Sequence, residues 1–157
     1  HSAMQDIVDL SPLAQLVSLE TIDLNHNPVE DVSPLSALFS LRELSLYDSR
    51  VSDFSALSAC PLLSRIDAGR TRVVSLQAFA GMSSLQQLNL RDTTLESLEG
   101  IESLTGLGLI SFGVVRSRDL TALNSLPLLD TVNLSEDYRQ DAARDLPDAT
   151  FEIVYSD

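Results

Sequence analysis

The sequence has no lysine, no tryptophan and a single cysteine, and aromatic residues make up only 5% of its 157 residues. One cysteine, Cys60, excludes a disulfide bond within the chain. No apolar run approaches the roughly 18 to 20 residues that a helix needs to cross a bilayer. No set of cysteines and histidines has the spacing of a metal site. The sequence therefore predicts no metal, no cofactor and no membrane insertion.

Positive charge is also scarce. Ten arginines face 23 acidic residues, so the net charge is −13 and the isoelectric point lies near 4.3. Nucleic acids and anionic membranes both need a positive surface, so this balance disfavours both as partners. Two explanations of the missing lysine stay open. One is a GC-rich bacterial genome, and the other is avoidance of lysine ubiquitination by a protein that works inside a eukaryotic host.

Leucine, in contrast, is abundant and recurs at one fixed spacing. A leucine stands every 22 residues, and Phe151 takes the next place in the series. The series is Leu19, Leu41, Leu63, Leu85, Leu107 and Leu129. Other apolar columns keep the same period and extend back to residue 7, so a partial repeat over residues 5–18 precedes the first full unit. A repeat of this length indicates a stack of similar structural units.

Each unit follows the order L-x-x-L-x-L-x-x-N-x-V. The alternating x-L-x-L segment predicts a strand with one buried face. Apolar residues three apart follow it, as at Val32, Leu35 and Leu38, and this spacing suits a 3₁₀ turn. Pro34 fits the start of such a turn. Successive strands should therefore align as a parallel sheet, with short 3₁₀ or single-turn helical pieces on the other side.

This pattern resembles the leucine-rich repeat family, in particular the short bacterial type of the internalins, over about residues 5 to 155. The resemblance implies an α/β solenoid, a right-handed superhelix bent into a horseshoe arc. A parallel sheet would line its concave face, and 3₁₀ or short helical segments its convex face. The family usually carries Asn at the ninth position of a unit. Here that column reads Asn27, Ser49, Thr71, Thr93, Val115 and Asp137.

Departures in this column have structural consequences. Hydroxyl groups can replace part of the hydrogen bonds that the asparagine side chain makes. Val115 cannot, so we expect a looser or rebuilt turn in the fifth unit, or a water in place of the missing groups.

We predict a single repeat domain over residues 4–157, preceded by a probable cloning remnant at residues 1–3. Full repeats should start near residues 19, 41, 63, 85, 107 and 129. A solenoid needs caps at its open ends, and residues 135–157 are predicted to form the C-terminal one. The N-terminal end has no comparable cap, as expected if the chain is a piece of a longer protein.

The predicted cap is a helix followed by a strand. Acidic residues at the start of 135–146 and Pro147 just past its end are typical of a helix, with Tyr138, Ala142 and Leu146 on one face. Residues 151–155 alternate and keep the 22-residue phase, which predicts a final edge strand.

The outward side chains of the sheet are the natural binding surface of a solenoid. They are diverse, whereas the inward columns are uniform. Tyrosine and arginine, which are enriched in interface hot spots, gather there with acidic and amide groups. The candidate residues are Tyr47, Asp48, Arg65, Asp67, Arg70, Asn89 and Arg91, with Asp92 beside them. The alternative is a surface lattice of salt bridges that contributes little energy.

The fifth unit supplies a second candidate feature. Leu109, Gly113 and Val114 replace polar groups on the same face, which predicts a shallow apolar patch at Leu109 and Val114. Cover by the next unit or by the cap is the competing interpretation. His26 is interpreted as an ordinary exposed histidine and Cys60 as a core residue, so no thiol–imidazole pair is expected. We predict that the protein is not an enzyme.

These features predict a module that recognises an unidentified partner protein through the concave face. On resemblance, it would be the targeting domain of a bacterial effector or surface protein. The alternative is an intracellular scaffold or regulatory subunit of an enzyme complex. We expect a monomer without disulfides, located in the bacterial cytoplasm or secreted into a host.

Overall fold

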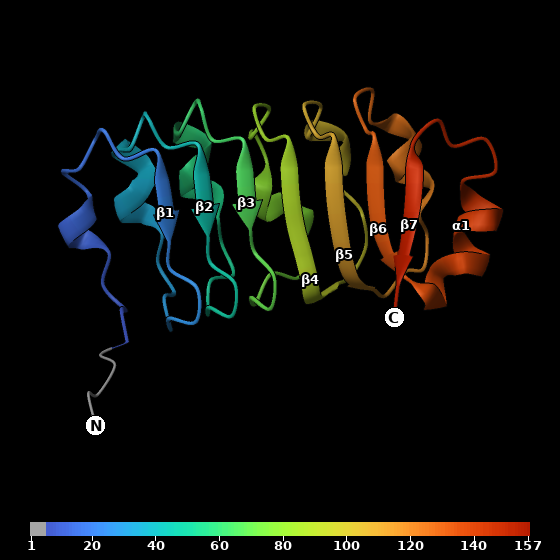
Figure 1. Ribbon diagram of the computed structural model, residues 1–157, viewed down its shortest axis with the longest axis horizontal. Helices are drawn as coiled ribbons and strands as arrows, with labels where there is room; N and C mark the ends of the chain where they lie inside the picture. Colours follow the sequence, from blue (N-terminus) through green and yellow to red (C-terminus); the bar gives the residue numbers. More distant parts are fainter. Residues whose placement is uncertain (1–5) are drawn as a thin grey trace.

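The computed structural model of the protein describes residues 6–157, so the predicted cloning remnant at residues 1–3 and the first residue of the partial repeat lie outside the described residues. Within this part of the chain, seven strands form one parallel sheet in chain order (Figure 1). They are β1 (Thr21–Asp23), β2 (Glu43–Ser45), β3 (Arg65–Asp67), β4 (Gln87–Leu95), β5 (Leu109–Val115), β6 (Thr131–Ser135) and β7 (Glu152–Ser156).

The register of the first six strands follows the leucine period. Ile22 lies beside Leu44, Leu44 beside Ile66, and the same 22-residue steps continue to Val132. These residues are buried because alternate side chains of a strand point to the same face. The predicted strands and their inward columns are therefore confirmed.

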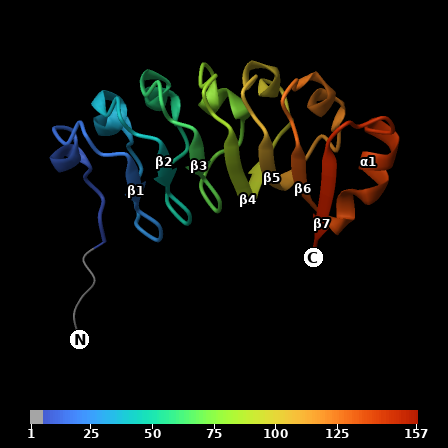
Figure 2. The same cartoon turned by 45° about the horizontal axis from the view of Figure 1, so that its top comes forward.

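Short 3₁₀ helices cover the opposite side of the sheet. They are η1 (Ser11–Leu13), η2 (Ser33–Ala37), η3 (Ser55–Ala59), η4 (Leu76–Phe79), η5 (Ile101–Ser103) and η6 (Thr121–Ser125). Figure 2 shows them along the outer side of a shallow arc, with the strands on the inner side. Pro34 lies in the first turn of η2, as predicted, where a missing N–H group leaves no hydrogen bond unmade.

A second column with the same period starts these 3₁₀ segments, and our sequence analysis missed it. In each unit one side-chain oxygen accepts a hydrogen bond from the backbone N–H two residues later, at 2.8 to 3.2 Å. The acceptors are Asp9, Asp31, Asp53, Ser75, Ser97 and Asp119. Such local bonds favour a turn at each of these places.

One continuous hydrophobic core runs between the sheet and the 3₁₀ segments. Phe54 and Phe79 pack against each other inside it, with ring centroids 4.9 Å apart. Cys60 is buried in the same core, as predicted, and its burial raises the pKa of the thiol. The core therefore takes up the cysteine as a small apolar side chain.

The C-terminal cap has the predicted order of elements. A 3₁₀ turn, η7 (Glu136–Tyr138), leads into α1 (Arg139–Asp145), and Tyr138, Ala142 and Leu146 bury the inner face of this helical segment. Figure 1 shows α1 at the end of the sheet, beyond β7. With seven residues α1 is short, and no helix within residues 6–157 has the length and apolar character needed to cross a bilayer.

The predicted phase of the final strand is wrong by one residue. Thr131 pairs with Glu152 and Leu134 with Tyr155, a step of 21 residues instead of 22. A slip of one residue moves every side chain of a strand to the other face. The 22-residue phase would place Tyr155 on the outward face and Val154 on the inward face. In the structure Tyr155 packs against the core and Val154 is 38% exposed.

Candidate recognition surface

The fifth-position side chains of the units form a hydrogen-bonded ladder along the outward face. Oδ1 of Asp67 accepts bonds from the backbone N–H of Gly69 and from the side-chain amide of Asn89, both at 3.0 Å. Oδ1 of Asn89 in turn accepts the backbone N–H of Arg91 at 3.0 Å. Two of the predicted site residues, Asp67 and Asn89, therefore hold the residues that follow each strand in place.

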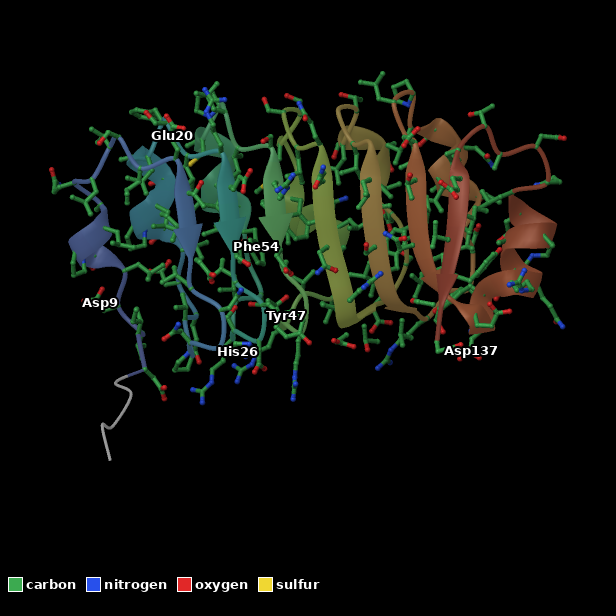
Figure 3. All side chains as sticks on the ribbon, viewed as in Figure 1. Asp9, Glu20, His26, Tyr47, Phe54 and Asp137 are labelled. Atoms are coloured by element: carbon green, nitrogen blue, oxygen red, sulfur yellow. The ribbon has the colours of Figure 1, made fainter. Side chains whose placement is uncertain are left out.

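A residue in the left-handed conformation follows each of the first three strands, and another lies within β4. The eighth residue of each of the first four units has a positive φ, between 52° and 59°, at His26, Asp48, Arg70 and Asp92. This conformation is uncommon for residues other than glycine. Its repetition brings the seventh and eighth side chains of neighbouring units together at the carboxyl-terminal edge of the sheet. Figure 3 shows His26 and Tyr47 at this edge.

Tyr47 is the central side chain of this edge. Its ring extends over Gly69 of the next unit, and its hydroxyl donates to Oδ2 of Asp92, two units away, at 2.8 Å. A Cβ atom at position 69 would stand only 2.6 Å from the Tyr47 ring, so the ring occupies the space that any other residue would fill. The hydrogen bond to the Asp92 carboxylate raises the pKa of Tyr47.

Charged groups surround the tyrosine. Oδ1 of Asp48 lies 3.2 Å from Nε of Arg70, and Oδ2 of Asp48 lies 3.1 Å from Nδ1 of His26. The His26 ring meets the Tyr47 ring edge-on, with centroids 5.7 Å apart. We call His26, Tyr47, Asp48, Arg70 and Asp92 the edge cluster. Sequence analysis left His26 out of the site, although it occupies the same column as Asp48, one unit earlier.

The remaining predicted basic residues lie elsewhere. Arg65 starts β3 and pairs with Glu43 at 3.4 Å, so it lies at the opposite end of the strand from the edge cluster. Arg91 is exposed and faces a hollow on the C-terminal side. The predicted cluster of tyrosine and arginines is therefore divided between three places.

The turn of the fifth unit is rebuilt, which corrects the predicted position of Val114. β4 and β5 change register, so Val114 lies beside Thr94 and Val115 beside Leu95. Val114 is thus two places away from the column of Asp92, where we had placed it. Leu109 is the first residue of β5 and Val114 the last but one, so they lie near opposite ends of the strand and do not form the predicted continuous patch.

Gly113 and Tyr138 make this rebuilding possible. The backbone of Gly113 lies so close to the preceding unit that a Cβ atom there would be 2.4 Å from the Thr93 carbonyl oxygen. The Tyr138 hydroxyl accepts the N–H of Val115 at 2.6 Å and donates to the Val115 carbonyl at 3.2 Å. A side chain from the cap therefore supplies the polar group that the ninth position of this unit lacks.

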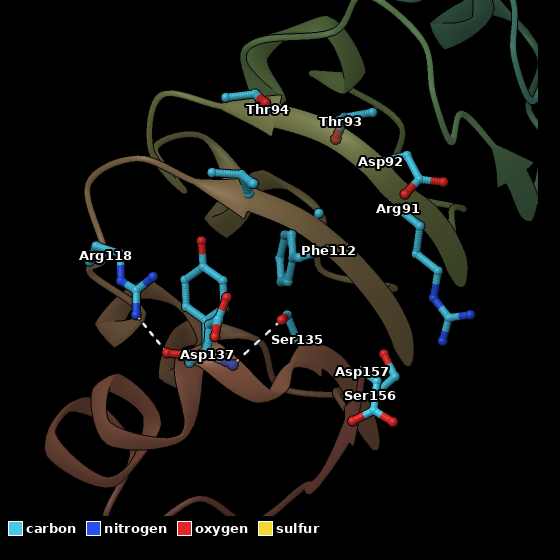
Figure 4. A pocket seen from close by; sticks show the side chains of 13 residues that line it. Arg91, Asp92, Thr93, Thr94, Phe112, Arg118, Ser135, Asp137, Ser156 and Asp157 are labelled. Atoms are coloured by element: carbon cyan, nitrogen blue, oxygen red, sulfur yellow. Dashed lines mark hydrogen bonds between the residues drawn. The ribbon is translucent and has the colours of Figure 1, made fainter.

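A hollow of about 640 Å³ opens between this rebuilt turn and the cap (Figure 4). Its lining includes Arg91, Thr93, Gly113, Val114, Asp137 and Tyr138. Arg118, on the cap side, donates to the Asp137 carbonyl at 2.6 Å and lies 4.2 Å from the centroid of the Tyr138 ring. Within residues 6–157, no group of three or more His, Cys, Asp or Glu side chains is arranged to hold a metal ion.

Comparison with protein-family models gives no match for this sequence, and comparison with curated proteins gives none either. Solved structures do match. An internalin (inlF) from Listeria monocytogenes is 21% identical, with a TM-score of 0.68, over 99% of this chain and 54% of that chain. An internalin C2 (inlC2) from the same species is 22% identical, with a TM-score of 0.76, over 96% of this chain and 67% of that chain.

A third structure, of TLR13 in complex with ssRNA13, is 22% identical with a TM-score of 0.69 and covers 80% of this chain and 19% of that one. This chain therefore spans about half of the first internalin and a smaller part of TLR13. The stacked strands, the 22-residue register and these likenesses agree on the architecture. The protein has the leucine-rich repeat fold.

Proposed function

We propose that this protein is a recognition module that binds a partner protein through the outward face of its sheet, with the edge cluster at the centre of the contact. The observation that carries the proposal is the fixed position of Tyr47 across Gly69, with its hydroxyl on Asp92. An aromatic ring that is already ordered loses little conformational freedom on binding. Tyrosine and arginine beside it are the residue types that dominate interface energetics.

Charge favours a protein as the partner. The net charge of −13 opposes binding to a phosphate backbone, which requires a positive footprint. The TLR13 structure is a complex with RNA, so the fold by itself is compatible with either kind of ligand. The choice of a protein partner therefore rests on the acidic surface and on the composition of the edge cluster.

A capture experiment tests the proposal. Immobilised wild-type protein is compared with the double variant Tyr47→Ala/Arg70→Ala, by quantitative mass spectrometry of proteins retained from a lysate of the source organism or of its host. Arg72→Ala is the matched control, because Arg72 is an exposed arginine that pairs with Glu30 away from the cluster. We expect a partner that the control retains and the double variant loses. Equal recovery of the partner by a folded double variant would exclude the edge cluster as its binding site.

The likeness to the two internalins supports a finer proposal, that the module is the targeting region of a bacterial effector or surface protein. The full reading frame tests it. A secretion signal, cell-wall anchor or catalytic domain encoded with the module would agree with the proposal. A stable stoichiometric complex with a bacterial enzyme whose activity it changes would instead favour a regulatory subunit.

A further inference from the structure

Arg91 differs from every other arginine of the chain. Nine of the ten arginines form an ion pair with a carboxylate, as expected where 23 acidic residues are available. Arg91 has no such partner among residues 6–157, although Asp92 is its neighbour in sequence. The Asp92 carboxylate is bonded to the Tyr47 hydroxyl instead. Arg91 thus presents an uncompensated guanidinium group to the hollow.

The lining of the hollow also carries negative charge. Asp137 lines it from η7, across from Arg91 in Figure 4, and Asp157 lines it just after β7. Neither carboxylate has an arginine partner within the described chain. The positive charge of Arg118, close by, is already taken up by its ion pair with Asp141. The two rims of the hollow therefore carry unpaired charges of opposite sign.

Gly113 lies between the residues that carry these charges. Arg91, Gly113 and Ser135 occupy the seventh positions of three successive units, and only the middle one has no side chain. A Cβ atom at position 113 would meet the Thr93 backbone, so no side chain fits there and none stands between Arg91 and Ser135. A ligand in this space would meet Arg91 on one side and the Asp137 carboxylate on the other.

We infer that this hollow is a subsite for a partner segment that presents one acidic and one basic side chain, the acidic one to Arg91 and the basic one to Asp137. This inference rests on the proposed function and specifies the chemistry of one part of that surface. Residues i and i+2 of an extended segment point to the same side, so a Glu-x-Lys sequence offers both charges at once. The carboxylate has a planar partner in the guanidinium group, which can bind both of its oxygens.

Short peptides test the subsite directly. The probes are the capped peptides Ala-Glu-Ser-Lys-Ala, Ala-Gln-Ser-Lys-Ala and Ala-Glu-Ser-Gln-Ala, titrated into the ¹⁵N-labelled full chain by NMR. We expect the doubly charged peptide to shift the amide signals of Thr93, Gly113 and Ser135. Each neutralised peptide should bind roughly two- to fivefold more weakly, as for the loss of one exposed ion pair.

Matched variants assign each charge. Arg91→Gln should weaken binding of the Glu-Ser-Lys peptide but not of the Gln-Ser-Lys peptide. Asp137→Asn should weaken binding of the Glu-Ser-Lys peptide but not of the Glu-Ser-Gln peptide. Arg72→Gln, a change at an exposed arginine outside the hollow that pairs with Glu30, should change neither affinity. Absence of shifts at about 10 mM peptide, or equal losses for all three peptides in Arg91→Gln, would overturn the subsite. If the peptides fail to bind but capture of the partner still depends on Tyr47 and Arg70, only the subsite is refuted. If capture does not depend on Tyr47 and Arg70, the proposed function is refuted.

Discussion

At the ninth position of three units, a buried or half-buried side chain donates a hydrogen bond to the carbonyl group three residues earlier. The hydroxyl groups of Thr71 and Thr93 make this bond at 2.6 Å, and the amide of Asn27 makes it at 3.1 Å. Ser49 is buried at the same position, yet its hydroxyl has no hydrogen-bond partner within the described chain. A buried hydroxyl without a partner loses its bonds to water without compensation.

This difference predicts that Ser49→Thr stabilises the protein. The β-branched side chain restricts χ1 and should direct the hydroxyl to the carbonyl of Leu46, as in the two threonine units. We expect the free energy of unfolding to rise by about 1 kcal/mol, the usual net contribution of one hydrogen bond. Urea denaturation followed by circular dichroism measures it. Thr71→Val is the control and should lower the same quantity, and an unchanged or lower midpoint for Ser49→Thr would contradict the prediction.

Gly69 provides a second prediction at this scale. In Gly69→Ala the new methyl group would meet the Tyr47 ring at 2.6 Å, so the ring must move away and its bond to Asp92 should break. The pKa of Tyr47, raised by that bond, should then fall towards the ordinary value of about 10. NMR titration of labelled tyrosine rings, with Tyr47→Phe to assign the signal, measures this change. An unaltered titration would mean that the ring does not depend on the space over Gly69.

At the scale of elements, the period of 22 was sufficient to predict the strands and the 3₁₀ segments, because one apolar pattern repeats in every unit. The helix of the cap was predicted from its acidic start and from Pro147 just past its end. The position of Val114 and the phase of the last strand were both predicted wrongly, and each error is a change of register. In the fifth unit Val115 indicated a rebuilt turn, but the change of register could not be predicted. The shorter turn is compensated before Leu120, so the spacing from Leu98 to Leu120 remains 22. In the last unit the step from β6 to β7 is 21 residues, so the 22-residue period predicted the wrong face for Tyr155.

The composition of the edge cluster was predictable only in part. Adjacent columns placed Tyr47, Asp48 and Arg70 near one another, because parallel strands lie about 4.8 Å apart. The contact of Tyr47 with Asp92 depends on Gly69 having no side chain. The three residues lie in three successive units, so comparing residues within one column does not predict the contact. The isolation of Arg91 likewise follows from the hydrogen bond that engages Asp92, which no spacing reveals.

The docking of the cap on the fifth unit gives a prediction for Tyr138. In Tyr138→Phe the buried N–H of Val115 loses its acceptor, so we expect a loss of about 1 to 3 kcal/mol in the free energy of unfolding. Tyr155→Phe is the matched control, because the Tyr155 hydroxyl makes no hydrogen bond within the described residues, and it should be nearly neutral. Both are measured by urea denaturation. Equal stability of the two variants would show that the Tyr138 hydroxyl is not needed.

At the scale of the whole molecule, the large negative charge has two opposed effects on stability. A net charge of −13 destabilises the compact state by repulsion, which weakens as carboxylates take up protons. The carboxylates that start the 3₁₀ segments act in the other direction. The pKa values of Asp9, Asp31, Asp53 and Asp119 are all lowered, chiefly by hydrogen bonds from the serine or threonine two residues later.

These lowered pKa values predict how the protein responds to acid. A carboxylate whose pKa is lower in the folded state stabilises it fully above the unfolded value, about 3.9 for aspartate, and loses that effect as the pH falls through the folded value. Stability should therefore hold or rise slightly from pH 7 to 5, as repulsion weakens, and decline below about pH 4. Asp31→Asn/Asp53→Asn should decline less, because the asparagine oxygen still accepts the hydrogen bond and does not titrate.

The control for this prediction must change the net charge equally without altering a hydrogen bond that starts a 3₁₀ segment. Asp6→Asn/Asp148→Asn does so, since no hydrogen bond to either side chain occurs within residues 6–157. Urea midpoints of the three proteins between pH 7 and 2.5 separate the two effects. Near pH 7 the stability of both variants should rise by a similar amount, because each has less charge repulsion. Only the first should keep more of its stability below pH 4, and parallel curves for the two variants would mean that the repeated turns do not carry the acid sensitivity of the solenoid.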